Sequence, residues 1–120
     1  MSVPEYAVYY LEIVTSDVES SRQLYETTYG LSFDGPIPEL GNAFVAVLPD
    51  GSRCGIRAPM ADHESPIVRT YLRVPDIRAA VDDVLRLGGE LALEPTELPG
   101  HGKIAIYLLG GVQQGLWQVP

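Results

Sequence analysis

The chain has 120 residues, of which 46% are hydrophobic, and its 16 acidic and 8 basic side chains give a formal charge of -8. The length fits one domain, and the composition argues against disorder. The negative charge makes nucleic acid and anionic membranes poor partners, and no apolar run approaches the roughly 18 residues that a membrane helix needs. The single cysteine excludes an intramolecular disulfide, and the start MSVPEYAVYY lacks a basic signal segment. We therefore expect a cytoplasmic protein.

Two segments of the chain, 10–30 and 69–89, share one pattern at a spacing of 59 residues. Each begins with a strand-like run, continues through an acidic helix-start signal and an amphipathic stretch of about three turns, and stops at glycine. The residues in register are Val14, Asp17, Val18, Gly30 and Gly51 with Arg73, Asp76, Ile77, Gly89 and Gly110. We interpret the chain as a duplicated β-α-β-β-β unit. It comprises module one (1–57), a proline-containing linker (58–66) and module two (67–120).

In module one, the run 7–14 is rich in Tyr, Val and Ile and predicts a strand. Its alternation places Tyr10, Glu12 and Val14 on one face, a mixed set typical of a lined cavity. Capping residues at 15–17 predict a helix over 18–29 that ends at Gly30. This helix is expected to bury Val18, Tyr25 and Tyr29. Turn signals divide the remainder into strands at 31–33, 43–48 and 53–57.

In module two, the strand 67–74 is expected to turn Val68, Thr70, Leu72 and Val74 toward the core and Arg69, Tyr71 and Arg73 to the other side. Asp76 is expected to cap the next helix, which places apolar residues on one face at helical spacing. Those residues are Ile77, Ala80, Val81 and Val84. Strands follow at 90–93, 103–108 and 114–119. The loop 94–102 is long for a hairpin, and we expect it to overhang a cavity.

The paired modules, the helix starts SDV and PDI, the helices ending in glycine and the last strand GLWQ resemble the vicinal oxygen chelate superfamily. This group includes glyoxalase I, bleomycin-resistance proteins and extradiol dioxygenases. The resemblance covers nearly the whole chain and implies an α+β fold in which two βαβββ modules form curved mixed sheets around a cavity. It also implies a homodimer, since members often complete their cavities from two chains. The superfamily hosts several functions, so the fold leaves the activity open.

The resemblance also points to four positions for a metal site. In metal-dependent members, side chains that are mostly His, Glu or Gln approach a divalent ion from the cavity faces of the first and last strands of each module. The corresponding residues here are Tyr10, Gly55, Arg69 and Gly115. Glycine has no side-chain ligand, and a guanidinium group repels a metal ion. Neither His63 nor His101 has a partner at metal-ligand spacing, so we expect neither a metal nor another cofactor.

Six side chains are predicted to share the cavity face and to form a ligand site, and Tyr107 is a further candidate. They are Tyr10, Glu12, Arg57, Arg69, Tyr71 and Trp117. Aromatic walls with a few polar groups are typical of small-molecule sites. Arg57 and Arg69 suit a carboxylate or phosphate, but Glu12 equally suits an ion pair with either arginine, because a buried charge needs a partner. Trp117 and Tyr71 equally suit the core or a dimer interface, and Cys54 fits an inert buried thiol.

Three hypotheses about function follow. The first is a metal-free protein that binds a small organic molecule, with an anion as one candidate cargo; its variant is an acidic drug-sequestering resistance protein, although the arginines disfavour a cationic drug. The second is a metal-independent isomerase or lyase in which Glu12, Tyr10 or His101 moves protons. The third is a protein whose duplicated sheets mainly dimerise or regulate a partner. We adopt the first and leave open whether the protein is an enzyme.

Overall fold

The computed structural model describes residues 3–120, so the first two residues of the expected module one lie outside the described residues. Module one contains β1 (Val8–Val14), α1 (Val18–Tyr29), β2 (Asp34–Ile37), the short 3-10 helix η1 (Pro38–Leu40), β3 (Ala43–Val47) and β4 (Arg53–Arg57). Module two contains β5 (Ile67–Arg73), α2 (Ile77–Arg86), β6 (Glu90–Leu98), β7 (Gly102–Leu109) and β8 (Val112–Gln118). The expected order of strands and helices therefore occurs twice.

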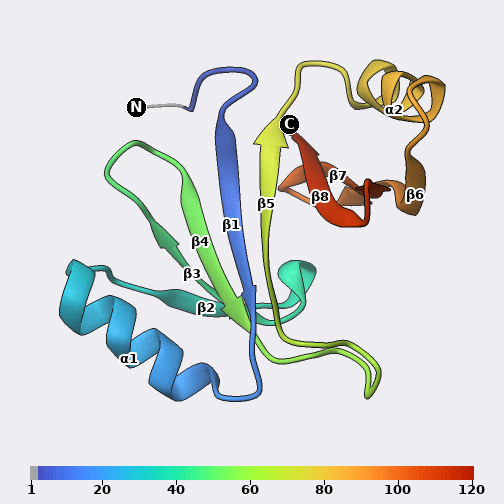
Figure 1. The fold of residues 1–120 in the computed structure, drawn as a ribbon. Helices are drawn as coiled ribbons and strands as arrows, with labels where there is room; N and C mark the ends of the chain where they lie inside the picture. The colour runs from blue at the N-terminus through green and yellow to red at the C-terminus, as the bar shows by residue number, and fades with distance from the viewer. Residues whose placement is uncertain (1–2) are drawn as a thin grey trace.

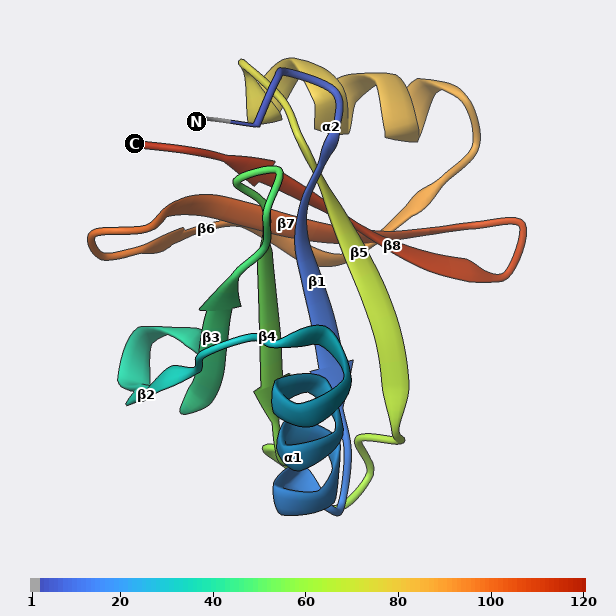
Figure 2. The same cartoon turned by 90° about the vertical axis from the view of Figure 1, so that its left-hand side faces the viewer.

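All strands join one sheet in the order β2-β3-β4-β1-β5-β8-β7-β6. The first strands of the two modules, β1 and β5, are antiparallel neighbours at its centre, and each pairs in parallel with the last strand of its own module. The sheet is strongly twisted, so that β7 and β8 run across the direction of β1 and β4 (Figures 1 and 2). This mixed, curved sheet with two helices confirms the expected α+β class.

Both helices begin where the capping signals predicted. The Asp17 side chain accepts a hydrogen bond from the Ser20 backbone N–H at 3.1 Å, and Asp76 accepts two at the start of α2. Helix α2 buries Ile77 and Val81 in a cluster with residues of β7 and β8. Such carboxylate caps satisfy N–H groups that have no partner within the helix.

Helix α1 covers the sheet less completely than predicted. It packs on β4 but buries none of its residues. Val18 and Tyr25 are half-buried, and Tyr29 is 61% exposed. Tyr29 instead contacts Tyr25 edge-to-face, with ring centroids 5.1 Å apart. The expectation that all three side chains are buried was wrong, because α1 has too few apolar residues along one side to bury a whole face of the helix against the sheet.

Two boundaries also differ from the prediction. Residues 31–33 form no strand, and β2 lies at 34–37; β6 continues to Leu98, so only 99–101 separate it from β7. The expected long loop over a cavity is thus absent from this part of the described chain. Both strands contain a proline, Pro36 or Pro95, and both lie at an edge of the sheet. An edge strand tolerates proline because it needs hydrogen bonds on one side only.

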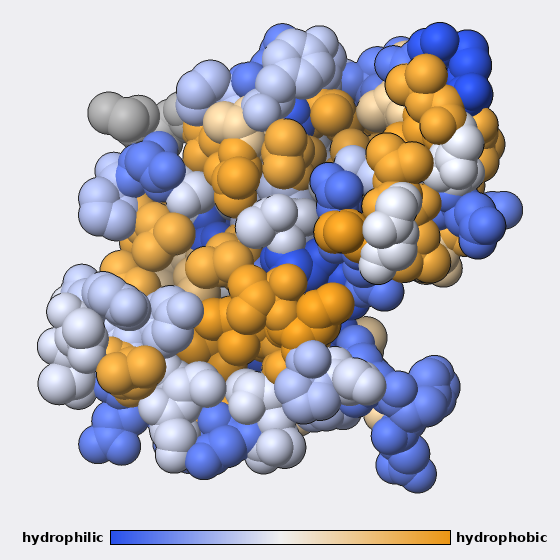
Figure 3. Space-filling view, in the orientation of Figure 1, coloured by the Kyte–Doolittle hydropathy of each residue, from blue (hydrophilic) through white to orange (hydrophobic). Residues whose placement is uncertain are grey.

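The prediction for β5 was right about the face that carries Arg69 and Tyr71, which lies on the cavity side of the sheet, and wrong about the opposite face. Val74, after the strand, is buried as expected, but Val68 is 64% and Leu72 is 37% exposed, whereas Arg69 and Tyr71 are buried. The buried face closes a cavity, while the opposite face lies between the two helices. Hydrophobic side chains gather on this uncovered face (Figure 3). Neither helix within residues 3–120 is long and apolar enough to cross a membrane.

Candidate functional site

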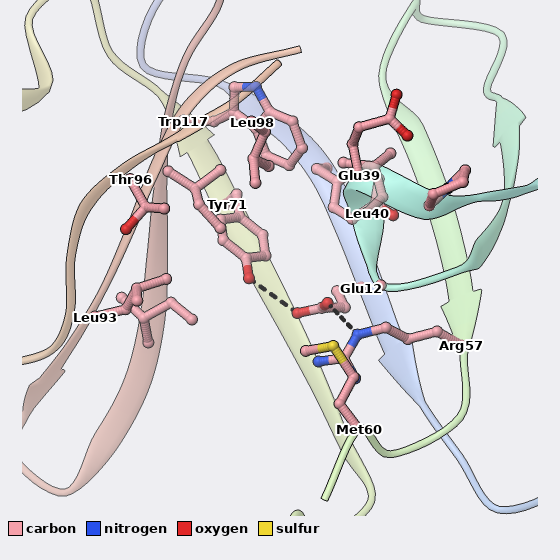
Figure 4. A pocket seen from close by; sticks show the side chains of 15 residues that line it. Glu12, Glu39, Leu40, Arg57, Met60, Tyr71, Leu93, Thr96, Leu98 and Trp117 are labelled. Atoms are coloured by element: carbon pink, nitrogen blue, oxygen red, sulfur yellow. Dashed lines mark hydrogen bonds and ion pairs between the residues drawn. The ribbon is translucent and has the colours of Figure 1, made fainter. Parts of the chain in front are cut away.

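A cavity of about 340 Å³ lies between the two modules. The central strands and their neighbours form its floor, η1 and the linker form one side, and β6 and β7 form the other (Figure 4). The floor carries Tyr10, Glu12, Arg57, Tyr71 and Trp117. The walls are mainly apolar and carry Leu40, Met60, Leu93, Leu98, Ile104 and Ile106, with Glu39 and Thr96 as their polar side chains. The cavity therefore combines a polar floor with hydrocarbon sides, as small-molecule sites do.

The Glu12 carboxylate is the centre of the polar floor. It is 7% exposed, and it stands opposite Arg69 in the β1–β5 register. Its Oε1 atom accepts hydrogen bonds from Arg69 Nη1 and, at 2.9 Å, from the Tyr71 hydroxyl. Its Oε2 atom accepts a hydrogen bond from Arg57 Nε at 2.9 Å. Two guanidinium groups and one phenol thus hold a carboxylate that would be costly to bury alone.

Each arginine has a second partner on the side away from Glu12. Arg57 donates from Nη1 and Nη2 to the two oxygens of Glu64 at 2.9 and 2.7 Å, and Arg69 Nε donates to Gln113 Oε1 at 2.7 Å. The hydrogen bonds from Arg57 lower the pKa of Glu64 to about 2. Burial alone would lower the pKa of Arg57, but its bonds to Glu64 and Glu12 outweigh burial and raise it. Two carboxylates therefore balance two cations.

This network changes the interpretation of the arginines. The sequence left open whether they bind an anionic ligand or pair with Glu12, and the structure has them paired with Glu12. The two arginines do not make the pocket basic, because the charges of Glu12, Glu64, Arg57 and Arg69 cancel. A carboxylate or phosphate entering the cavity would have to compete with Glu12 or Glu64 for these guanidinium groups.

Two tyrosines occupy the space above two glycines. A Cβ atom on Gly55 would lie 1.6 Å from the Tyr10 hydroxyl oxygen, and one on Gly115 would lie 2.3 Å from Cδ2 of Tyr71. Burial, followed by the nearby charge of Glu12, raises the pKa of both phenols, so they stay neutral. Trp117 packs against both rings, with centroid distances of 4.9 and 5.5 Å.

The same two glycines test whether a divalent metal fits. At the positions implied by the resemblance, Tyr10 and Tyr71 fill the space in which a ligand side chain from Gly55 or Gly115 would stand. Arg69 occupies a third position with a permanent cation, and both oxygens of Glu12 already accept guanidinium hydrogen bonds. No group of three or more His, Cys, Asp or Glu side chains suited to a metal occurs within residues 3–120. The residues present do not fit a divalent ion.

The remaining candidate residues divide between the cavity and its surroundings. Arg69 lies beside the floor and borders a neighbouring surface hollow together with His63. His101 and Tyr107 are not among the residues that line the cavity. The His101 carbonyl oxygen accepts the Trp117 Nε1–H hydrogen bond at 2.8 Å, and the Tyr107 hydroxyl donates to Gln114 at 3.1 Å. Cys54 is fully buried, and burial raises the pKa of its thiol to about 11.

Sequence reasoning missed the apolar walls and one partner of the ion network. Ile104 and Ile106 line the cavity from alternate positions of β7, so the period of two within that strand was a usable signal. Leu40 and Met60 come from a 3-10 turn and from the linker. Neither residue belongs to a periodic pattern. No local signal links Glu64 to Arg57, because their contact depends on how the linker folds back.

No protein-family profile matches the chain. It is 26% identical over 115 residues to proteins described as "Putative glyoxylase CFP32" from Mycobacterium bovis and Mycobacterium tuberculosis. This match covers 91% of the chain but only 44% of each relative, so the chain spans less than half the length of the curated relatives that it matches.

Solved structures with the same fold include a hypothetical protein, BH1468, from Bacillus halodurans, with a TM-score of 0.76, 13% identity and 94% of both chains covered. A methylmalonyl-CoA epimerase from Mycobacterium tuberculosis has a TM-score of 0.74 and 17% identity, with 100% of this chain and 93% of that chain covered. A Streptomyces coelicolor methylmalonyl-CoA epimerase in complex with 2-nitronate-propionyl-CoA has a TM-score of 0.70 and 15% identity, with 97% and 99% covered. Together, the fold and the glyoxylase match confirm the resemblance to the vicinal oxygen chelate superfamily.

Proposed function

We propose that the chain binds a small organic molecule in the cavity between its modules, without a divalent metal. Ligand sites commonly enclose about 300–1,000 Å³, and the cavity of about 340 Å³ falls in that range. The observation that carries the proposal is the combination of apolar walls with a floor whose polar groups are nearly all paired. Such a site can bind an apolar body by burial and needs few polar contacts to orient it.

The network also favours an uncharged ligand over the anionic cargo that the arginines suggested. An anion would add a third negative charge to Glu12 and Glu64 or compete with them for Arg57. A cationic drug would have to compete with two guanidinium groups for Glu12. The other carboxylate in the lining, Glu39, is exposed to solvent and therefore offers a cation only a weak contact. Moving a charged ligand from water into the cavity costs on the order of several kcal/mol when no oppositely charged side chain is free to pair with it.

A fragment screen tests this function. The indole N–H signal of Trp117, the only tryptophan, is followed by NMR while neutral aromatic fragments, aromatic carboxylates and aromatic amines are added. We expect the neutral fragments to shift this signal at the lowest concentrations. Ile106→Phe, which narrows the cavity from β7 without adding a second indole, should weaken binding, whereas Leu109→Phe on the exposed end of the same strand should not. Binding that is insensitive to Ile106→Phe would contradict the proposed site.

A second candidate function is proton transfer without a metal, by an isomerase or a lyase. A buried carboxylate and a phenol stand within hydrogen-bond distance at the cavity floor, in a fold shared with methylmalonyl-CoA epimerases. The test is exchange of the C2 proton of methylmalonyl-CoA in deuterium oxide, with Glu12→Gln as the comparison. Exchange above the uncatalysed rate, lost in Glu12→Gln while that variant keeps the circular dichroism spectrum of the folded chain, would favour the enzyme over the binding protein.

We also propose that the uncovered face of β1 and β5 joins two copies of the chain. Leu11, Ile13, Val68 and Leu72 share this face, according to the strand register. Apolar side chains in the centre of a sheet, without a helix over them, favour burial against another surface. The outward positions 11, 13, 68, 70 and 72 of these two strands carry no charged side chain that would select a different partner, and two copies can pair them isologously.

Sedimentation velocity tests the assembly. We expect a dimer for the natural chain and a monomer for Val68→Asp, while Val112→Asp, on a β8 residue that is 56% exposed, should remain dimeric. A natural chain that stays monomeric at micromolar concentration would contradict this proposal.

We also propose a cytoplasmic location, which the single, buried and unpaired thiol of Cys54 supports.

A further inference from the structure

We propose that the Tyr10 hydroxyl orients the ligand by donating a hydrogen bond to an oxygen of an uncharged carbonyl compound, such as a ketone or an ester. This inference rests on the proposed function, since it names the chemical class of ligand for the same cavity. It follows from an inventory of the polar groups that line the cavity floor.

Each of the other donor-bearing side chains of the floor donates to at least one protein acceptor. The Tyr71 hydroxyl donates to Glu12, Trp117 Nε1–H donates to the His101 carbonyl oxygen, and Arg57 binds Glu12 and Glu64. The Tyr10 hydroxyl makes no hydrogen bond to any of residues 3–120. Among the described residues of this floor, it is the one donor-bearing side chain without any protein hydrogen-bond partner.

The Tyr10 hydroxyl also reaches open space. The residue is only 3% exposed, yet no fully sealed side-chain N or O atom within the described residues lacks a hydrogen-bond partner. Because the Tyr10 hydroxyl has no hydrogen-bond partner, its oxygen must be accessible to solvent. It reaches solvent through the cavity that Tyr10 lines. Gly55 makes this placement possible, because a side chain there would collide with the phenol.

The environment of this hydroxyl selects a neutral acceptor. A phenol donates more readily than it accepts, because the ring withdraws density from its oxygen lone pairs. The nearby Glu12 carboxylate disfavours an incoming anion, and the two arginines that neutralise Glu12 leave no net positive charge for one. Walls of Leu40, Leu98 and Ile106 surround the remainder of the ligand with hydrocarbon. An apolar molecule with one carbonyl oxygen meets all of these conditions.

Three nearly isosteric probes test the inference: 2-acetylnaphthalene, 2-ethylnaphthalene and 2-naphthoate, which present a ketone, a hydrocarbon and an anion. Titrations are followed at the Trp117 indole N–H. We expect the ketone to bind about three- to tenfold more tightly than the hydrocarbon, the range that one neutral hydrogen bond supplies. The carboxylate should bind most weakly.

Tyr10→Phe should abolish the preference for the ketone while leaving the affinity for 2-ethylnaphthalene within about twofold. Tyr107→Phe, which removes a phenol outside the cavity lining, should keep the preference. If both neutral probes bind with equal affinity, or if Tyr10→Phe keeps the preference, the role of Tyr10 is refuted and the binding function stands. If 2-naphthoate binds best, the neutral ligand class is refuted. If no probe binds, both the proposed function and this inference are refuted.

Discussion

The phenol of Tyr10 lies directly over Gly55, and a Cβ atom built on Gly55 would lie 1.6 Å from its hydroxyl oxygen. Gly55→Ala should therefore force the tyrosine ring out of its place and destabilise the protein by about 1–3 kcal/mol, the usual cost of overpacking. Urea unfolding would measure the loss. In a Tyr10→Ala background the added methyl group has room, so the same substitution should cost at least about 1 kcal/mol less. Additive effects of the two substitutions would contradict the contact.

The ion network makes Glu12 the most sensitive charged residue of the sheet. Glu12→Gln keeps the volume but leaves Arg57 and Arg69 short of a counter-charge, and removing one partner of a buried ion pair costs about 3–5 kcal/mol. Urea unfolding at neutral pH should register a loss of that order. Glu19→Gln, in the exposed pair with Arg22, should change stability by less than about 1 kcal/mol. Equal effects of the two variants would argue against a buried network.

The contact between Glu64 and Arg57 predicts acid sensitivity. The folded state lowers the pKa of Glu64 from 4.5 to about 2, so the pair contributes full stability above the unfolded pKa. This contribution declines as the pH falls from about 4.5 toward 2. Because Glu64 is partly solvated, we expect roughly 1–3 kcal/mol.

The difference in unfolding free energy between the natural chain and Glu64→Gln should therefore shrink between pH 5 and pH 2. Asp83→Asn, in an exposed pair with Arg86, serves as the control and should show little change. A constant difference for Glu64→Gln across that pH range would contradict the role of the pair.

The thiol of Cys54 should be unreactive in the folded protein. It is fully buried, and its pKa is raised to about 11 by burial, so very little thiolate is present near neutral pH. A disulfide reagent at pH 8 should modify it at the rate of unfolding and at once in denaturant. Rapid modification of the folded chain would show that the strand opens readily.

The sequence by itself determined the local elements of this protein. Helix caps at Asp17 and Asp76, glycine stops and the spacing of 59 residues depend on contacts within a few positions or on repetition. The duplicated unit and the resemblance built on it were therefore predictable, as were the positions of Tyr10, Glu12, Arg57, Tyr71 and Trp117 around one cavity. The two edge strands that contain proline could not be predicted from the sequence, because a strand tolerates proline only where it lies at the edge of the sheet.

Only the tertiary structure decided which face of β5 is buried and how the charges pair. Val68 and Arg69 alternate equally well on either side of a strand, and hydrophobicity alone favours burying Val68; the pairing of β5 with β1 instead buries Arg69 against Glu12. The contact of Arg57 with Glu64 likewise depends on the path of the linker. A buried polar group is stabilised by partners distant in sequence, and such partners become neighbours only when the two modules join into one sheet.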